Sequence, residues 1–205
     1  MFTGITAGLF PVVGVERAPD RLQYTVQLSD ELVAGLRIGA SVAIDGVCQT
    51  VVSMEGQRVF FDAIKETLDK TTLGALDLGT RVAVERSRRV GDEIGGHDVA
   101  GHVVGTGRVH QVLHAGEVHE LRIAVPAGWM KYILHKGFIA VDGSSLTVGS
   151  TEAGGAFTVH LIPETMRLTN LGKKQLGERV NIELDPHTVA IVDTVERVLA
   201  GRNRP

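Results

Sequence analysis

Short runs of alternating or apolar residues recur along the whole chain and are separated by glycine-containing turns. Runs of this kind predict β-strands, because side chains of a strand point alternately to its two faces. The predicted strands of the first half cover residues 2–9, 22–29, 41–45, 48–54, 57–63 and 81–86. Those of the second half cover residues 103–112, 119–125, 137–142, 145–150, 156–162 and 179–184. Strands this short and evenly spaced favour a closed barrel or a sandwich over parallel α/β units. Helical turns are predicted at 30–36, 66–73, 126–134 and 164–171.

One hairpin occurs twice. Residues 44–51 read IDGVCQTV, and residues 141–148 read VDGSSLTV. Asp-Gly between two strand-like runs is a strong hairpin signal, since both turn residues need positive φ angles. The copies differ where Cys48, the only cysteine, is matched by Ser145. The pattern predicts two related sites with different reactive groups.

Two further blocks repeat at nearly the same offset. Residues 66–74 are matched by 164–172, and residues 79–85 by 177–183. Repeated blocks in a fixed order indicate a duplicated structural unit. The predicted domains are two homologous barrels and a tail, over residues 1–97, 98–186 and 187–205.

The segment between the barrels and the tail have different characters. Residues 91–102 are too rich in glycine for a stable helix and are read as a linker whose backbone can approach a ligand. Asp185 and Pro186 offer a helix start, and Gly201 a helix end. Between them the apolar residues recur at helical spacing. This narrow stripe is either an oligomerisation surface or packs on its own barrel.

Composition excludes several classes of protein. The chain of 205 residues is 43% hydrophobic and 22% charged, with a net charge of −3 and no long basic run, which argues against nucleic-acid binding. A single cysteine fits a reducing compartment, so we expect a cytoplasmic location. The start lacks the pattern of a signal peptide, and no apolar segment is long enough to span a membrane.

Three side chains could carry chemistry. Cys48 follows a tight turn, where a thiol can act as a nucleophile, although a lone cysteine can also be a small buried hydrophobe. His97 and His102 could act as general bases near neutral pH, and of the two only His102 rises above the expectation of a solvated surface residue. Their spacing and lack of a nearby cysteine fix no metal site, so no metal ligand is expected.

These motifs resemble the riboflavin synthase family. The resemblance is carried by the MFTGI start, the hairpin around Cys48, Glu66-Thr67-Leu68, the GGH and GH motifs of the linker, and the second-half echoes. It covers almost the whole chain.

The family implies an all-β fold of two six-stranded antiparallel Greek-key barrels, with a C-terminal helix that gathers three chains into a homotrimer. It implies a reaction without a cofactor, in which a four-carbon unit passes between two molecules of 6,7-dimethyl-8-ribityllumazine. The products are riboflavin and 5-amino-6-(D-ribitylamino)uracil. Lumazine synthase, the preceding enzyme, is a further partner that the sequence leaves open.

The resemblance also implies the site residues. In the N-terminal pocket they are Gly4, Ile5, Thr6, Cys48, Gln49, Thr50, Asp62, Ala63, Ile64, Lys65, Glu66 and Thr67. In the C-terminal pocket they are Gly101, His102, Val103, Lys136, Ser145, Leu146, Thr147, His160, Leu161, Ile162, Pro163, Glu164 and Thr165. Cys48 and His102 would assist nucleophile addition and proton transfer, while Ser145 and Thr147 position the second lumazine. Asp185 either contributes to catalysis or only caps the tail helix.

Three positions depart from what family members commonly have, namely Asp45, Gln49 and Val104. Two other functions remain open. A lumazine protein is a non-catalytic antenna with the same duplicated fold, but such relatives tend to lose the cysteine and histidines that this chain keeps. A purely structural barrel would leave those side chains unexplained.

Overall fold

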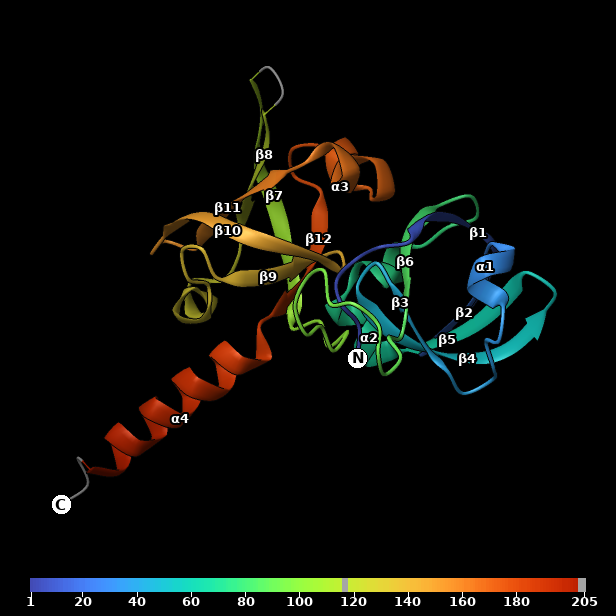
Figure 1. The fold of residues 1–205 in the computed structure, drawn as a ribbon, viewed down its shortest axis with the longest axis horizontal. Coiled ribbons are helices and arrows are strands. Elements are labelled where there is room, and N and C mark those ends of the chain that lie inside the picture. The colour runs from blue at the N-terminus through green and yellow to red at the C-terminus, as the bar shows by residue number, and fades with distance from the viewer. Residues whose placement is uncertain (116–117, 203–205) are drawn as a thin grey trace.

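Two β-barrels followed by one long helix make up the protein (Figure 1). The computed structural model describes residues 1–115 and 118–202. The first barrel contains β1 (Gly8–Ala18), β2 (Arg21–Gln27), β3 (Ser41–Ile44), β4 (Val47–Glu55), β5 (Arg58–Ile64) and β6 (Arg81–Arg86). The second contains β7 (Gly105–Ala115), β8 (Val118–Ala124), β9 (Phe138–Val141), β10 (Ser144–Glu152), β11 (Ala156–Leu161) and β12 (Arg179–Leu184).

Both barrels are closed, antiparallel and wound in the same way. The order around the first is β1-β2-β5-β4-β3-β6, and the second, read from β7, has the equivalent order β7-β8-β11-β10-β9-β12. Strands that are not consecutive are thus neighbours, as in a Greek key. The prediction of two six-stranded antiparallel barrels with a C-terminal helix is confirmed.

The first strand was misplaced by the sequence pattern. It was expected at residues 2–9, but β1 runs over Gly8–Ala18. Pro11 and Gly14, two residue types that are uncommon inside a strand, both lie within β1. In the structure β1 pairs with β6 up to Pro11 and with β2 from Val12 onward, with a bulge between Val12 and Gly14 where it changes neighbour.

The helical turns lie close to where they were expected. They are α1 (Asp30–Val33), α2 (Lys65–Lys70), η1 (Thr72–Ala75), η2 (Ala127–Tyr132), α3 (Pro163–Leu168) and η3 (Leu171–Lys173). Each of the two repeat-related predicted turns, at 66–73 and 164–171, is a short α-helix followed by a 3-10 turn. The linker contains neither helix nor named strand, in agreement with its glycine content.

Each barrel has its own apolar core, and a third, smaller cluster joins them. Tyr24 and Phe61 stack in the first core, and Phe157 is the largest side chain buried in the second. The joining cluster includes Phe2 and Val99, which pair as an isolated β-bridge. The segments that precede the two barrels therefore meet each other at the centre of the molecule.

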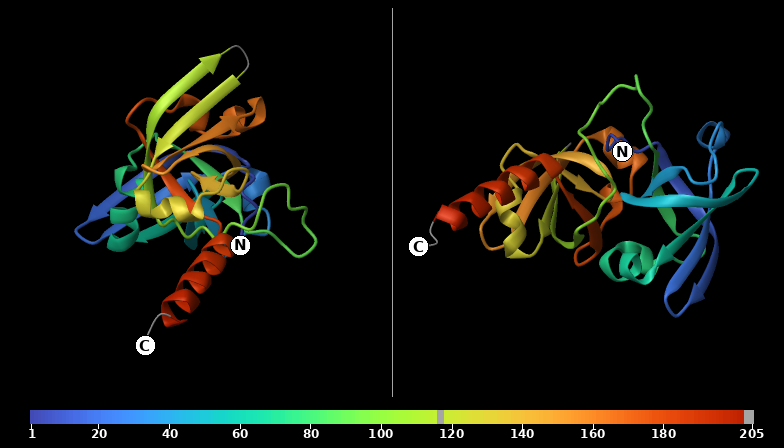
Figure 2. Two further views of the ribbon diagram at one scale, coloured as in Figure 1. Left: turned by 90° about the vertical axis from the view of Figure 1, so that its left-hand side faces the viewer. Right: turned by 90° about the horizontal axis from the view of Figure 1, so that it is seen from below.

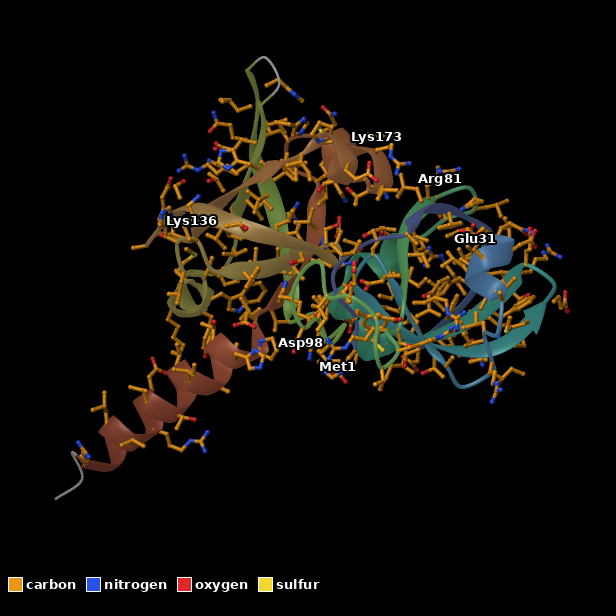
Figure 3. All side chains as sticks on the ribbon, viewed as in Figure 1. Met1, Glu31, Arg81, Asp98, Lys136 and Lys173 are labelled. Carbon is orange, nitrogen blue, oxygen red and sulfur yellow. The ribbon has the colours of Figure 1, made fainter. Side chains whose placement is uncertain are left out.

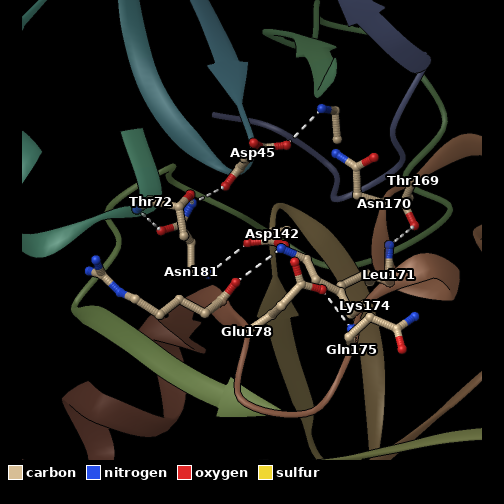
Figure 4. A network of polar contacts seen from close by, with 12 residues as sticks. Asp45, Thr72, Asp142, Thr169, Asn170, Leu171, Lys174, Gln175, Glu178 and Asn181 are labelled. Atoms are coloured by element: carbon tan, nitrogen blue, oxygen red, sulfur yellow. Dashed lines mark hydrogen bonds and ion pairs between the residues drawn. The ribbon is translucent and has the colours of Figure 1, made fainter. Parts of the chain in front are cut away.

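The two Asp-Gly turns also meet at this centre, where a buried polar network connects the barrels (Figure 4). Asp45 and Asp142 both have φ of 44°, and their carboxylates accept hydrogen bonds from the amides of Ala83 and Asn181 at 2.7 and 2.6 Å. The Asn181 side chain donates to the Asp45 carbonyl at 2.8 Å, which ties the second barrel to the first turn. Lys174 lies 3.2 Å from Asp142.

The tail helix α4 (Pro186–Arg202) projects away from both barrels (Figure 2). It continues past Gly201, the residue expected to end it. Tyr132 of η2 donates a hydrogen bond to Asp193 at 2.6 Å, so the first turns are attached to the second barrel. The apolar stripe on the helix is nevertheless uncovered, since Ile191 is 65% exposed and Val195 is 51% exposed. In the part of the chain that the structure describes, no helix combines the length and apolar character needed to cross a membrane.

Candidate functional site

Each barrel presents one cavity beside its copy of the hairpin. The cavity of the first barrel has a volume of about 210 Å³ and includes Cys48, Glu66 and Thr67. The cavity of the second has a volume of about 460 Å³. It is lined by seven of the expected residues, Lys136, Ser145, Leu146, Thr147, His160, Ile162 and Thr165. Each copy of the duplicated hairpin therefore borders a cavity, and the two linings share the repeat-related positions Cys48/Ser145 and Thr67/Thr165.

The segment that precedes each barrel contacts the hairpin of the other barrel. The amide of Ser145 donates to the Gly4 carbonyl at 2.8 Å, and the amide of Cys48 donates to the Gly101 carbonyl at 2.9 Å. The grouping of Gly4–Thr6 with Cys48 is therefore wrong, as is that of Gly101–Val103 with Ser145. Gly101, His102 and Val103 line the first cavity instead.

Two matching carboxylates hold these two segments. Glu85 accepts hydrogen bonds from the amides of Thr3 and Gly4, and Glu183 accepts them from Ala100 and Gly101. Burial raises the pKa of both carboxyls, although the amide donors pull it back. Gly4 has a positive φ of 76°, and a Cβ there would lie 2.6 Å from the Ser145 Cβ, so only glycine fits this approach.

Ser145 is paired with His97, the histidine that the sequence favoured less than His102 as a functional residue. Nδ1 of His97 lies 2.7 Å from the Ser145 hydroxyl oxygen, and its ring stacks on Phe138 with centroids 5.0 Å apart. Burial lowers the pKa of His97, although the nearby carboxylates of Asp185 and Asp98 raise it. A neutral imidazole in this position can accept the serine proton or donate to its oxygen. Gly96 makes the pair possible, because a Cβ on Gly96 would lie 2.7 Å from the Ser145 Cβ.

Strand alternation separates the hairpin residues of the first barrel. Cys48 and Thr50 point to the outer face, while Gln49 is 5% exposed and turned inward. There it accepts a hydrogen bond from the Tyr24 hydroxyl at 3.2 Å. The amide of Gln49 is thus part of the barrel interior and does not reach the cavity as expected. The alternation of inward and outward side chains along a strand would have been enough to predict that Gln49 points away from Cys48 and Thr50.

Other expected residues lie beside the cavities without lining them. Asp62 binds Gln23 at 3.0 Å on the outside of the first barrel, and Ala63 is buried in its core. Asp185 accepts hydrogen bonds from the amide and hydroxyl of Thr188, at 2.9 and 2.6 Å, and so caps α4. Although burial would raise it, these bonds hold the pKa of Asp185 below its usual value. The remaining expected residues that line neither cavity are Ile5, Thr6, Thr50, Ile64, Lys65, Leu161, Pro163 and Glu164.

Some lining residues escaped the sequence reading. Val47, Lys70 and Thr71 belong to the first cavity, and Val148 and Gly149 to the second. Lys70 lies four residues after Glu66 on α2 and pairs with it at 2.7 Å, a spacing that could have indicated it. Val47 directly precedes Cys48 and Val148 directly follows Thr147, both of which were expected in the site.

Comparisons with known proteins agree with this geometry. The profile of the Lumazine binding domain matches residues 3–87 and again residues 100–185. The riboflavin synthase of Escherichia coli (strain K12) is 50% identical over 203 residues, which cover 98% of this chain and 95% of that protein. The riboflavin synthase of Chlamydia pneumoniae is 41% identical over 204 residues and is matched along 100% of both chains.

A solved structure shares the fold. LumP complexed with riboflavin superimposes with a TM-score of 0.82 at 23% identity, over 90% of this chain and 100% of that one. At that identity the likeness concerns the fold alone. The identity to the synthases, by contrast, extends over nearly the whole length and both domains. The chain belongs to the riboflavin synthase family.

Proposed function

We propose that the protein converts two molecules of 6,7-dimethyl-8-ribityllumazine into riboflavin and 5-amino-6-(D-ribitylamino)uracil, in the cytoplasm and without a cofactor. One observation carries the proposal. Each copy of the hairpin borders a cavity, and one copy presents the thiol of Cys48 where the other presents the hydroxyl of Ser145. A reaction between two identical molecules needs two similar sites that treat them differently.

The two sites divide the chemistry between them. One lumazine must lose a proton from its 7-methyl group, and the other must accept a nucleophile at a ring carbon. Cys48 and His102, which line the first cavity, assist the addition and the proton transfer. Ser145 and Thr147 in the second cavity orient the other lumazine. Holding the two rings together supplies much of the rate by proximity.

Each barrel binds one lumazine, and the reacting pair forms between the N-terminal barrel of one subunit and the C-terminal barrel of the next. The first cavity supports this arrangement. Its volume of about 210 Å³ is smaller than the roughly 300 Å³ at which ligand pockets usually begin, which is in keeping with a site that a neighbouring subunit would complete. Residues 1–97 and 98–186 are the two binding domains, and residues 187–205 gather three chains through the uncovered stripe of α4.

A direct assay tests the proposal. Purified protein is mixed with 6,7-dimethyl-8-ribityllumazine, and riboflavin absorbance is followed with time. Many turnovers per chain, with one riboflavin formed for every two lumazines consumed, are expected. Absence of riboflavin under conditions where the lumazine binds would overturn the proposal.

A second candidate is a non-catalytic lumazine carrier. The observation that favours it is the likeness of the fold to LumP complexed with 6,7-dimethyl-8-(1'-D-ribityl) lumazine, with a TM-score of 0.79. A carrier would bind the lumazine stoichiometrically and leave it unchanged. The same mixture separates the two functions, since bound but unconverted lumazine identifies the carrier.

A further inference from the structure

A cavity of about 570 Å³ opens on the seam between the two barrels, away from both candidate pockets. It shares no lining residue with either of them. Its walls are mainly one repeated segment, residues 72–81 in the first half and 170–179 in the second. Lys173 and Arg81, which come from the two barrels, both lie at this opening (Figure 3). The proposed function assigns no role to it.

The lining is strongly cationic. Arg81, Arg108, Lys173 and Arg179 all contribute to it, and within residues 1–115 and 118–202 none of the four forms an ion pair. A fifth cation, Lys174, is paired with Asp142. Like charges gathered in one concave site repel each other and attract an anion.

Two acidic groups also line the cavity, but both are engaged elsewhere. Glu178 accepts a hydrogen bond from the Gln175 amide at 2.6 Å. Asp45 accepts one from the Ala83 amide at 2.7 Å, inside the buried network between the barrels. Neither carboxylate is within ion-pair distance of the four cations. A hydrogen bond from a neutral amide leaves a carboxylate charged, so four unpaired cations face two carboxylates and the cavity keeps a net positive charge.

Main-chain carbonyls hold the guanidinium groups in place. Arg81 donates through Nη2 to Leu9 at 2.6 Å, and Arg108 donates through Nη1 to Gly177 at 3.1 Å. A guanidinium has five N–H groups, so each keeps several free for a ligand. Neutral carbonyls fix the position of a charge without cancelling it. Such pre-positioned forks are well suited to a phosphate group.

The second half of the chain contributes two lysines to this cavity at positions where the first half has uncharged residues. The repeat aligns Lys173 and Lys174 of the second half with Ala75 and Leu76 of the first. One of the two lysines neutralises Asp142, whereas Lys173 is exposed and has no structural partner among the described residues. The barrel fold itself does not require a cation at this position, because the first barrel closes without one.

We propose that this seam cavity binds a small molecule carrying a phosphate or diphosphate group. A volume of about 570 Å³ suits a ligand of sugar-phosphate or nucleotide size. The anion would sit between Arg81 on one barrel and Lys173 on the other, so that binding bridges the two halves of the chain. A ligand held in this way is distinct in place and charge from the uncharged lumazine ring of the proposed reaction.

Isothermal titration of the full-length protein at low salt tests the inference, with pyrophosphate, ribose 5-phosphate and ribose as probes. We expect saturable binding of one pyrophosphate or one ribose 5-phosphate per chain, weakening as salt is added, and none of ribose. Arg81→Gln and Lys173→Gln should each weaken it about tenfold or more, since each removes a charge-assisted contact. The control is Arg37→Gln, an exposed arginine outside every cavity described above.

Two results would overturn the inference. One is the absence of saturable binding of either phosphate compound. The other is binding of equal strength in Lys173→Gln, Arg81→Gln and the control, which would place the anion elsewhere. Lys173 is exposed, so its replacement leaves the fold intact and keeps the test decisive even if Arg81→Gln lowers stability. None of these readouts depends on turnover of the lumazine.

Discussion

Gly46 and Gly143, the glycines of the two duplicated turns, lie in direct contact. A Cβ on Gly46 would lie 2.3 Å from the Gly143 amide nitrogen. We expect Gly46→Ala to lower the free energy of unfolding by about 3 kcal/mol, combining backbone strain with a clash. Gly79→Ala is the matched control, because Gly79 also has a positive φ but nothing lies within 4 Å of its Cβ position. That control should lose only about 1 kcal/mol in urea unfolding. Equal losses would contradict the contact.

Asp45 should make the protein less stable as pH rises. Burial, with a further contribution from Asp142, raises the pKa of Asp45 to about 7. A carboxyl that binds its proton more tightly when folded stabilises the fold fully below its unfolded pKa of about 4, and this stabilisation is lost as pH rises to about 7. Asp45→Asn should raise the free energy of unfolding at pH 8 by about 1–2 kcal/mol and have little effect at pH 4. Urea titrations at the two pH values measure this, and the exposed Asp20→Asn should show no such difference.

Cys48 should be needed for turnover and not for binding. Its side chain lines the first cavity, and its amide is held by Gly101. We expect Cys48→Ala to lower kcat at least tenfold, as is typical of a lost nucleophile or proton-transfer group, about 1.4 kcal/mol or more. Lumazine binding, measured by fluorescence titration, should change little. Undiminished turnover would remove Cys48 from the mechanism.

Ser145 should act together with His97. Ser145→Ala removes the hydrogen bond to Nδ1 of His97, which spans 2.7 Å. We expect turnover to fall about tenfold and its acid limb to shift, since the imidazole loses a partner. The matched control is Ser150→Ala on the same strand, where the serine binds Thr158 instead. A pH–rate profile of Ser145→Ala that is parallel to that of the unmodified protein would show that the pair has no role in proton transfer.

The apolar stripe of α4 should hold the subunits together. Ile191 and Val195 are 65% and 51% exposed in the single chain. Replacing Val195 with Glu should dissociate the proposed trimer, because a charge would be buried at the contact. Thr194→Glu, on an exposed polar position of the same helix, should leave it intact. Light scattering coupled to size exclusion gives the mass of each variant, and a monomeric unmodified protein would contradict the proposed assembly.

Local signals in the sequence were enough to predict the barrels. An Asp-Gly turn determines its own hairpin, and a repeat of three blocks implies that whatever the first half forms, the second forms too. The same locality explains the error at β1. Pro11 breaks a run within the sequence, yet in the fold it lies where the strand changes from β6 to β2.

The site was harder to predict because it depends on contacts between the halves. Nothing in the pattern around Gly4 shows that it reaches Ser145 rather than Cys48, since both partners lie far along the chain. His97 was undervalued for a similar reason. It belongs to a glycine-rich segment that reads as exposed, and only the fold places it beside Ser145 and Phe138.

The reciprocal reach of Gly4 and Gly101 means that neither barrel is self-sufficient. Separating the two halves would deprive each hairpin amide of the backbone carbonyl that accepts its hydrogen bond across the centre. Two copies of a single half could restore both contacts by facing each other in a symmetric pair. A single half of the chain is therefore expected to pair with a second copy of itself, which the covalent link between the two barrels makes unnecessary.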